Sequence, residues 1–189
     1  MIIILSSIPT LLPLSLLLLL LLAATTTVTT AVESTNLINQ TCMTSSISDP
    51  NINYNFCINA FQTAPSSLNA NLTRLGLISI NLVKHNVNST TFLVQTLLEN
   101  NKVDNCTKSG LEDCLQLYSN SMFTIREVAR DYRARRLNGA NVKLSSVMEA
   151  STTCEDGFKD VGVGSPLTKH NNDTFQLSAI ALSIICMLY

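Results

Sequence analysis

Two cysteines, Cys114 and Cys154, each lie within a segment of helical pattern and are separated by 40 positions. That separation suits one long helix, a turn, and a second long helix that returns beside the first. A disulfide between the two cysteines would join antiparallel helices and leave neither thiol free for chemistry. The pattern therefore favours a disulfide-stapled helical scaffold over an active site.

The amino-terminal part carries no charged residue before Glu33, and its long apolar core is followed by small residues. This pattern is typical of a secretory signal peptide, although the first residues lack the usual Lys or Arg. Cleavage fits after Ala24 or after Ala31. We expect the second region, which makes residues 1–31 the signal peptide and residues 32–189 the mature domain.

The alternative is an uncleaved membrane anchor, because the apolar stretch is long enough to span a bilayer. Pro9 and Pro13 interrupt that stretch and favour the signal peptide. Six cysteines, an even number, fit an oxidising compartment. Five N-x-Ser/Thr sequons agree with a secreted glycoprotein, and their asparagines are Asn39, Asn71, Asn88, Asn105 and Asn172.

The mature part is long enough for one domain with a substantial core. Its net charge of −1 implies neither a polyanionic partner nor an anionic membrane. It begins with a short unit in which two helical segments, 36–43 and 54–61, flank a turn at 48–51. Cys42 and Cys57 would close this helical hairpin.

Helical periodicity marks the rest of the mature chain, and strand-type alternation is hard to find. Long amphipathic helices with short connections must bury their apolar stripes against one another, because no sheet is available to receive them. We predict an all-α fold, an antiparallel four-helix bundle preceded by the hairpin at one end. The helical segments run from Ser66 or Ser67 to about 82, from about 89 to 98, from about 110 to 135, from about 140 to 160, and from Ser165 or Thr168 to the carboxyl end, with a turn at 137–139.

Sequence proximity and the helix pattern favour the pairs Cys42–Cys57 and Cys114–Cys154 among the possible disulfides. Cys106 lies in an apparent loop, and Cys186 lies in the apolar last helix, where a small buried side chain is the simplest interpretation. These two cysteines either pair or stay free. A zinc site is not expected, because the cysteines lack zinc-ligand spacing and only two histidines are present.

No catalytic constellation is recognisable, and the paired carboxylates at 112–113 and 155–156 are best explained as helix-surface groups. The strongest charge feature is a basic run between residues 126 and 136. Asp131 and Arg135 are spaced for an ion pair within one helix. The run is either a solvated helix end, where cations suit the helix dipole, or a partner-binding edge. Nucleic acid is a poor candidate, because the chain is expected to be secreted.

Four short motifs carry a family resemblance: residues 53–57 (NYNFC), 113–118 (DCLQLY), 153–158 (TCEDGF) and 165–168 (SPLT). With them, the mature chain resembles the plant invertase and pectin methylesterase inhibitor family, most closely its pollen-type branch. The resemblance implies a four-helix bundle after a helical hairpin, with both cysteine pairs joined. It also implies a protein that is not an enzyme, needs no cofactor or metal, and binds a plant enzyme. Acid invertase is the favoured target and pectin methylesterase the next, in the cell wall or, alternatively, the vacuole.

In invertase inhibitors a Pro-Lys-Phe tripeptide, just ahead of the helix with the fourth family cysteine, reaches into the target's active site. The corresponding stretch here is about 135–139, and it contains no such tripeptide. The partner-binding residues that we expect in this region are Arg133, Arg135, Arg136 and Asn138. A second hypothesis, from another class, is a helical carrier that holds a small apolar ligand inside the bundle.

Overall fold

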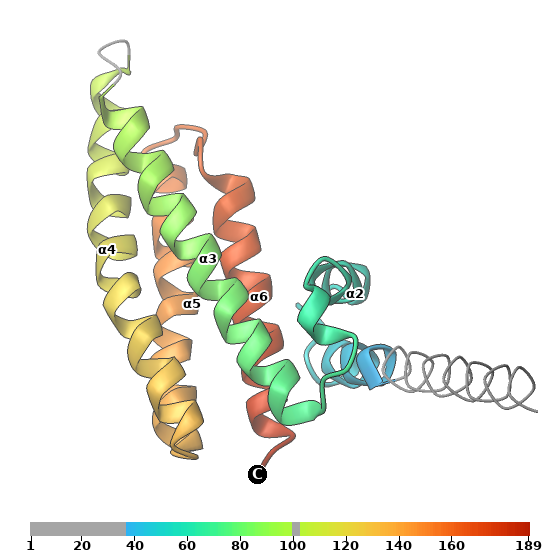
Figure 1. The fold of residues 1–189 in the computed structure, drawn as a ribbon. Helices are drawn as coiled ribbons and strands as arrows, with labels where there is room; N and C mark the ends of the chain where they lie inside the picture. Colours follow the sequence, from blue (N-terminus) through green and yellow to red (C-terminus); the bar gives the residue numbers. More distant parts are fainter. Residues whose placement is uncertain (1–36, 100–102) are drawn as a thin grey trace, which may run out of the picture.

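The computed structural model describes residues 37–99 and 103–189, and the expected signal peptide lies outside them. These residues form helices without any strand, as the sequence predicts (Figure 1). None of the described helices is both long and apolar enough to cross a membrane. After a helical segment at 37–48, the elements are α2 (Tyr54–Gln62), the 3₁₀ turn η1 (Pro65–Ser67), α3 (Leu72–Leu98), α4 (Asn105–Arg133), α5 (Leu137–Asp160) and α6 (Thr168–Cys186).

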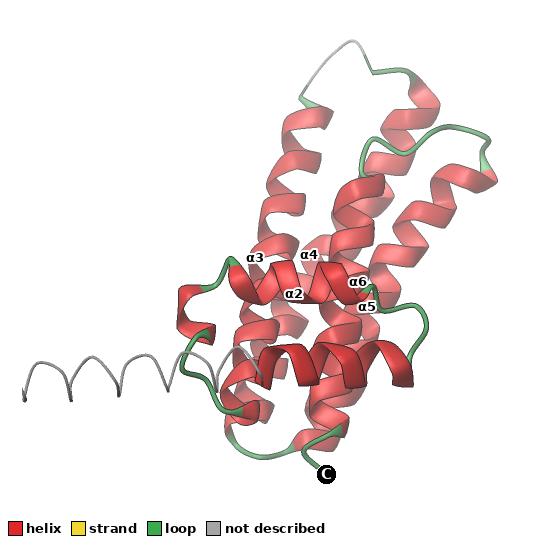
Figure 2. Ribbon diagram, turned by 90° about the vertical axis from the view of Figure 1, so that its right-hand side faces the viewer, coloured by secondary structure: helices red, strands yellow, loops and turns green. Residues whose placement is uncertain are grey.

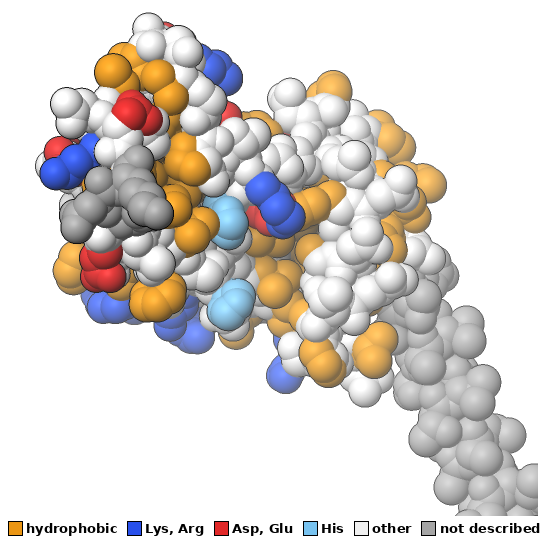
Figure 3. Space-filling model, turned by 90° about the horizontal axis from the view of Figure 1, so that it is seen from above, with side chains coloured by type: hydrophobic (Ala, Val, Ile, Leu, Met, Phe, Trp, Pro, Cys, Tyr) orange, Lys and Arg blue, Asp and Glu red, His pale blue; other side chains and the backbone are white. Residues whose placement is uncertain are grey.

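Helices α3 to α6 form an antiparallel four-helix bundle, which confirms the predicted fold class (Figure 1). Each helix packs against the next along the chain, and α6 also packs against α3, so that the four helices close into a ring. Fully buried side chains from all four helices fill the space between them, among them Val87, Leu111, Ile125, Leu144 and Ile185. At the end where α3 and α5 finish, basic and acidic side chains lie intermixed on the surface (Figure 3).

Helix α3 differs from the prediction at both its start and its middle. The helix begins at Leu72 and not at Ser66 or Ser67, and the Asn71 side chain caps it by accepting a hydrogen bond from the Arg74 amide. It also runs without a break through residues 83–88, where we predicted a gap. The hydroxyls of Ser89 and Thr90 bond back to the carbonyl of Asn86, so residues typical of a helix start here sit in the interior of a helix.

The amino-terminal hairpin lies across the side of the bundle formed by α3 and α6, near the end where α3 begins (Figure 2). The predicted disulfide between Cys42 and Cys57 joins its two helices. Gln176 of α6 holds the turn of the hairpin, because its side-chain oxygen accepts from the Asn53 amide at 2.9 Å and its nitrogen donates to the Asn51 carbonyl at 2.6 Å. The hairpin therefore has its own attachment to the bundle.

The second predicted disulfide, Cys114–Cys154, links α4 to α5, and the two Cα atoms are 5.0 Å apart. Cys106 and Cys186 are free and exposed. Cys106 lies in the first turn of α4 and not in a loop, and Cys186 is not the buried side chain that we expected. They cannot pair within one chain, because α4 begins at the end of the bundle opposite the one where α6 finishes (Figure 1).

A buried polar cluster crosses the bundle interior. The Tyr118 hydroxyl of α4 donates to the Asn171 side-chain oxygen at 2.7 Å and lies 3.2 Å from the Thr174 hydroxyl, both on α6. The Asn171 side-chain nitrogen donates to the Glu155 carboxylate of α5, and the Asn86 side-chain nitrogen of α3 donates to the Thr174 hydroxyl. Burial raises the pKa of Tyr118 to about 12. The cluster therefore connects all four helices through hydrogen bonds that are largely shielded from water.

Replacing Tyr118 with phenylalanine tests this cluster. The substitution removes the hydroxyl and leaves the buried Asn171 oxygen without its donor, so we expect a loss of about 1–3 kcal/mol in the free energy of unfolding. Urea denaturation measures the change. The matched control is Tyr54→Phe, because the Tyr54 hydroxyl has no hydrogen-bond partner among the described residues and its loss should be nearly neutral. Equal effects of the two substitutions would contradict the account.

Candidate functional site at the α4–α5 turn

The turn between α4 and α5 lies three residues earlier in the chain than predicted. Helix α4 ends at Arg133, and α5 already begins at Leu137, so residues 137–139 belong to its first turn and do not form the loop. The reversal is made by residues 134–136, in which Arg135 adopts a positive φ of 59°. For a residue with a side chain this left-handed conformation costs about 1–2 kcal/mol. The surrounding structure therefore has to hold the turn in place.

Asp131 is the residue that holds it. This residue is only 6% exposed. One oxygen accepts from the Arg136 Nε at 2.9 Å and also contacts Arg136 Nη2, while the other accepts from Lys143 Nζ at 2.6 Å. The Asp131 carbonyl also accepts from the Arg136 amide at 2.9 Å. Asp131 thus pairs with Arg136 and Lys143, and the predicted pair with Arg135 is wrong.

Gly139 and Asn138 complete the packing around this turn. A Cβ atom at Gly139 would lie 3.0 Å from an Asp131 carboxylate oxygen. The absence of a side chain at Gly139 therefore provides the space that this carboxylate occupies. The Asn138 side-chain oxygen accepts a hydrogen bond from the Tyr189 hydroxyl at 2.6 Å. The carboxyl-terminal residue therefore contacts the same region as the turn.

Hydrogen bonds from Lys143 and then from Arg136 lower the pKa of Asp131 below its ordinary value of 3.8. A carboxyl group whose pKa is lowered by folding stabilises the protein above its ordinary pKa, and this contribution is lost as the pH falls through the lowered value. We therefore expect Asp131→Asn to lower the melting temperature near neutral pH, and the difference from the wild type to shrink in strong acid.

Melting curves across this pH range measure the effect. Asp156→Asn is the control, because Asp156 pairs with Lys159 on the open surface, where an ion pair contributes little. A difference between Asp131→Asn and the wild type that stays constant at all pH values would contradict the assignment.

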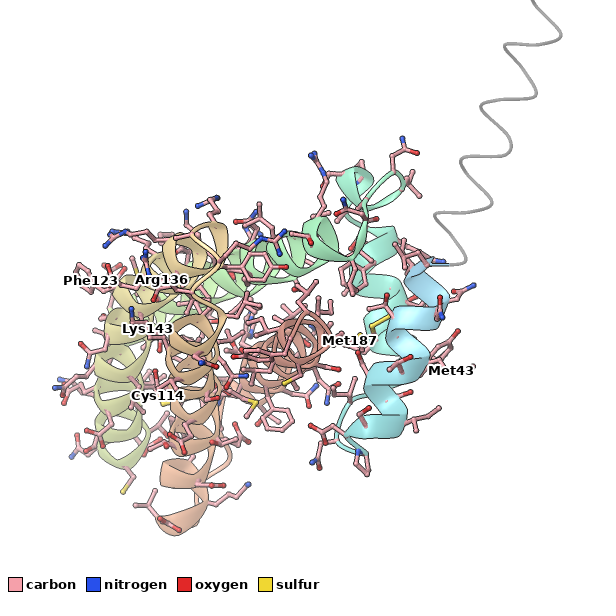
Figure 4. All side chains as sticks on the ribbon, turned by 90° about the horizontal axis from the view of Figure 1, so that it is seen from below. Met43, Cys114, Phe123, Arg136, Lys143 and Met187 are labelled. Atoms are coloured by element: carbon pink, nitrogen blue, oxygen red, sulfur yellow. A yellow bond between two sulfur atoms is a disulfide. The ribbon has the colours of Figure 1, made fainter. Side chains whose placement is uncertain are left out.

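The four expected partner-binding residues, Arg133, Arg135, Arg136 and Asn138, are exposed and lie together at this end of the bundle. Seen from below in Figure 4, Arg136 and Lys143 lie on the same side of the α4–α5 pair as Phe123, away from Met43 of the hairpin. Sequence reasoning missed Lys143 and Tyr189. Lys143 lies one helical turn beyond Gly139 on α5, and nothing in the local pattern indicates that it reaches Asp131.

The structure does not indicate a functional site at the other candidate positions. The five sequon asparagines are exposed, and glycosylation of each remains a prediction. The carboxylates at 155 and 156 do not converge, since Glu155 bonds Thr168 and Asn171 while Asp156 bonds Lys159. Within residues 37–99 and 103–189, no group of three or more His, Cys, Asp or Glu side chains is placed to hold a metal ion.

Comparisons with known proteins agree with this architecture. A family model described as plant invertase/pectin methylesterase inhibitor matches residues 36–184. A protein of Platanus acerifolia named "Putative invertase inhibitor" is 39% identical over 160 residues, which cover 84% of this chain and 88% of that protein. "Pectinesterase inhibitor 2" of Arabidopsis thaliana is 23% identical and covers 72% of this chain and 78% of its own length.

Among solved structures, a mutant form of a pectin methylesterase inhibitor from Arabidopsis superposes with a TM-score of 0.66. The superposition covers 76% of this chain and 95% of that one, at 24% sequence identity. This likeness supports the fold alone. Together with the family match over most of the sequence, it leads to one conclusion: the chain belongs to the plant invertase/pectin methylesterase inhibitor family.

Proposed function

We propose that the mature protein inhibits a plant carbohydrate-active enzyme by inserting the α4–α5 turn into the enzyme's substrate cleft. Acid invertase is the favoured target and pectin methylesterase the next. The observation that carries the proposal is the turn itself, which presents exposed cationic side chains on a rigid, disulfide-linked helix pair. The protein acts without catalysis of its own, and its expected signal peptide directs it to the cell wall, with the vacuole as the alternative.

The chemistry of the turn supports the choice of invertase. Enzymes that hydrolyse glycosidic bonds generally carry a pair of carboxylates in the active site. Guanidinium groups bind carboxylates through two parallel, charge-assisted hydrogen bonds. Arg133 and Arg135 form no ion pair with any described residue, so their donors are available to such a site. The turn lacks the Pro-Lys-Phe tripeptide, and the arginines would take over the contact with the target.

Rigidity lets this small surface bind tightly. Association costs free energy for every side chain and loop that becomes ordered. The turn is already fixed by the Asp131 contacts, and α4 and α5 are already joined by a disulfide. Little conformational freedom is therefore lost when the turn enters a cleft.

The test is a titration of acid invertase and of pectin methylesterase with the purified protein from residue 32. We expect inhibition of one of them that saturates at one inhibitor per enzyme. The variant Arg133→Gln/Arg135→Gly should weaken inhibition at least about tenfold, since two charge-assisted hydrogen-bonding groups are removed. Glycine at position 135 suits the positive φ and keeps the turn.

The control is Lys84→Gln/Lys108→Gln, which removes the same charge from exposed positions on α3 and α4 away from the turn. It should inhibit like the wild type. No inhibition of either enzyme at micromolar excess would overturn the proposal of an inhibitor. Equal inhibition by both double variants would overturn the role of the turn.

The carrier hypothesis is less well supported. The largest fully buried side chains of the bundle interior, among them Tyr118, Phe158 and Leu144, occupy the space where a ligand would have to lie. The Tyr118 cluster also places polar groups across its middle. Displacement of a fluorescent fatty acid by added lipids would revive this alternative, and we expect none.

A further inference from the structure

Positive charge is concentrated in one segment of this chain. Five of the six arginines of the chain fall between residues 126 and 136. With Lys143 and the carboxylates Glu127 and Asp131, the segment 126–143 has a net charge of +4, in a chain whose net charge is −1. The overall balance gave no reason to expect a polyanionic partner, but the local concentration does.

Three of these arginines form a row on the outer face of α4. Arg126, Arg130 and Arg133 follow one another at four- and three-residue steps, and all three are exposed. At 1.5 Å per residue the row extends about 10 Å along the helix axis. We call Arg126, Arg130, Arg133 and the neighbouring Phe123 the arginine row.

Interaction with the helix dipole does not account for the whole arginine row. Favourable interaction with the helix dipole is confined to the last turn, and Arg126 lies before that turn. Within the described residues, Arg126 and Arg133 have no carboxylate partner, and Arg130 has only the half-exposed Glu127 at 2.7 Å. Glu127 in turn lies 3.5 Å from Lys143, so the one carboxylate among the described residues that pairs with the row is shared between two cations.

Phe123 adds a second kind of contact. This ring is 68% exposed, and the Arg126 guanidinium lies 5.7 Å from its centre. Stacking against an aromatic ring orients a guanidinium and leaves its N–H groups free at the edges. An exposed apolar ring beside oriented donors suits a ligand with both carboxylates and apolar faces, as a sugar ring carrying a carboxylate has.

We propose that the arginine row binds a linear polyuronate, a polysaccharide with a carboxylate on each sugar. Cations in single file along one helix match charges repeated along one chain, and Phe123 packs against the face of a sugar ring. The expected destination of the protein is a compartment outside the cell. Binding there through Arg126, Arg130 and Phe123 would hold the protein on an acidic polysaccharide, while the residues from Arg133 onward stay free for the enzyme. This inference goes beyond the proposed inhibition and does not need it.

The experiment measures binding of the full mature protein to polygalacturonate by calorimetry at low salt. We expect binding that weakens steeply as salt is added and that disappears when the polygalacturonate is fully methyl-esterified. Arg126→Gln/Arg130→Gln should weaken binding at least about tenfold, while Lys84→Gln/Lys108→Gln should change it less than about twofold. Circular dichroism of each variant confirms that it is folded.

The same variants separate this inference from the proposed function. Arg126→Gln/Arg130→Gln should inhibit the target enzyme in solution like the wild type, because the α4–α5 turn is unchanged. The inference is overturned if the wild type does not bind polygalacturonate, if it binds the esterified polymer equally well, or if both double variants lose affinity alike. Binding only to an acidic protein and not to the polymer would also overturn it.

Discussion

Removing the Cys114–Cys154 disulfide by the double substitution Cys114→Ala/Cys154→Ala is expected to lower the free energy of unfolding by about 4 kcal/mol. The disulfide closes a segment of 40 residues. Without the disulfide, the unfolded chain gains conformational entropy, which favours unfolding. Both side chains are almost fully buried between α4 and α5, so the smaller alanines also lose packing. Guanidinium denaturation of both proteins measures the difference.

The Cys42–Cys57 disulfide provides the comparison. In the same loop-closure description its removal costs about 3 kcal/mol, but the hairpin packs only against one side of the bundle. We therefore expect Cys42→Ala/Cys57→Ala to open the hairpin locally and leave α4 and α5 protected in hydrogen exchange. Cys114→Ala/Cys154→Ala should instead lower protection throughout the bundle. Identical exchange patterns in the two variants would contradict the separation of hairpin and bundle.

Gly76→Ala is expected to lower the free energy of unfolding by at least about 2 kcal/mol, although alanine favours helices over glycine. A Cβ atom at Gly76 would lie 2.1 Å from the Tyr132 hydroxyl oxygen and 3.1 Å from a methyl group of Ile184. Tyr132 cannot simply turn away, because it is buried and its hydroxyl donates to the Thr73 carbonyl at 2.8 Å. Thermal and urea unfolding measure the loss.

Gly157→Ala is the matched control, because Gly157 lies in the exposed part of α5 and a Cβ atom there meets nothing within 4 Å. It should stabilise the protein by up to about 1 kcal/mol. The double variant Gly76→Ala/Tyr132→Phe removes the clashing oxygen and should recover part of the loss, so the two changes should not be additive. A neutral Gly76→Ala would show that α3, α4 and α6 do not approach each other as closely as the structure has them.

The helical class, the bundle and both disulfides could be predicted from the sequence, because they depend on periodicity and on cysteine spacing. Leu111, Tyr118, Ile125 and Tyr132 recur on one face of a single helix, and all four are buried. Cys114 and Cys154 lie within two such faces. A repeat of apolar residues determines which side of a helix turns inward, whatever its partner is.

The prediction failed where side chains from distant parts of the chain decide the outcome. Asn86 and Ser89 are typical of a helix boundary, but Asn86 is held inside α3 by its bonds to the His170 carbonyl and to Thr174 on α6. The identity of Arg135 does not indicate a left-handed conformation. That conformation is stabilised by the contacts of Asp131 with Arg136 and Lys143. Local propensity is a weak guide where tertiary contacts of this kind compete with it.

The contact between the α4–α5 turn and an enzyme is the central claim, and hydrogen exchange of the complex tests it most directly. With whichever of acid invertase and pectin methylesterase is inhibited, we expect the amides of residues 133–138 to become protected and those of the hairpin, residues 37–62, to stay unchanged. Protection of the hairpin with an unchanged turn would contradict the claim.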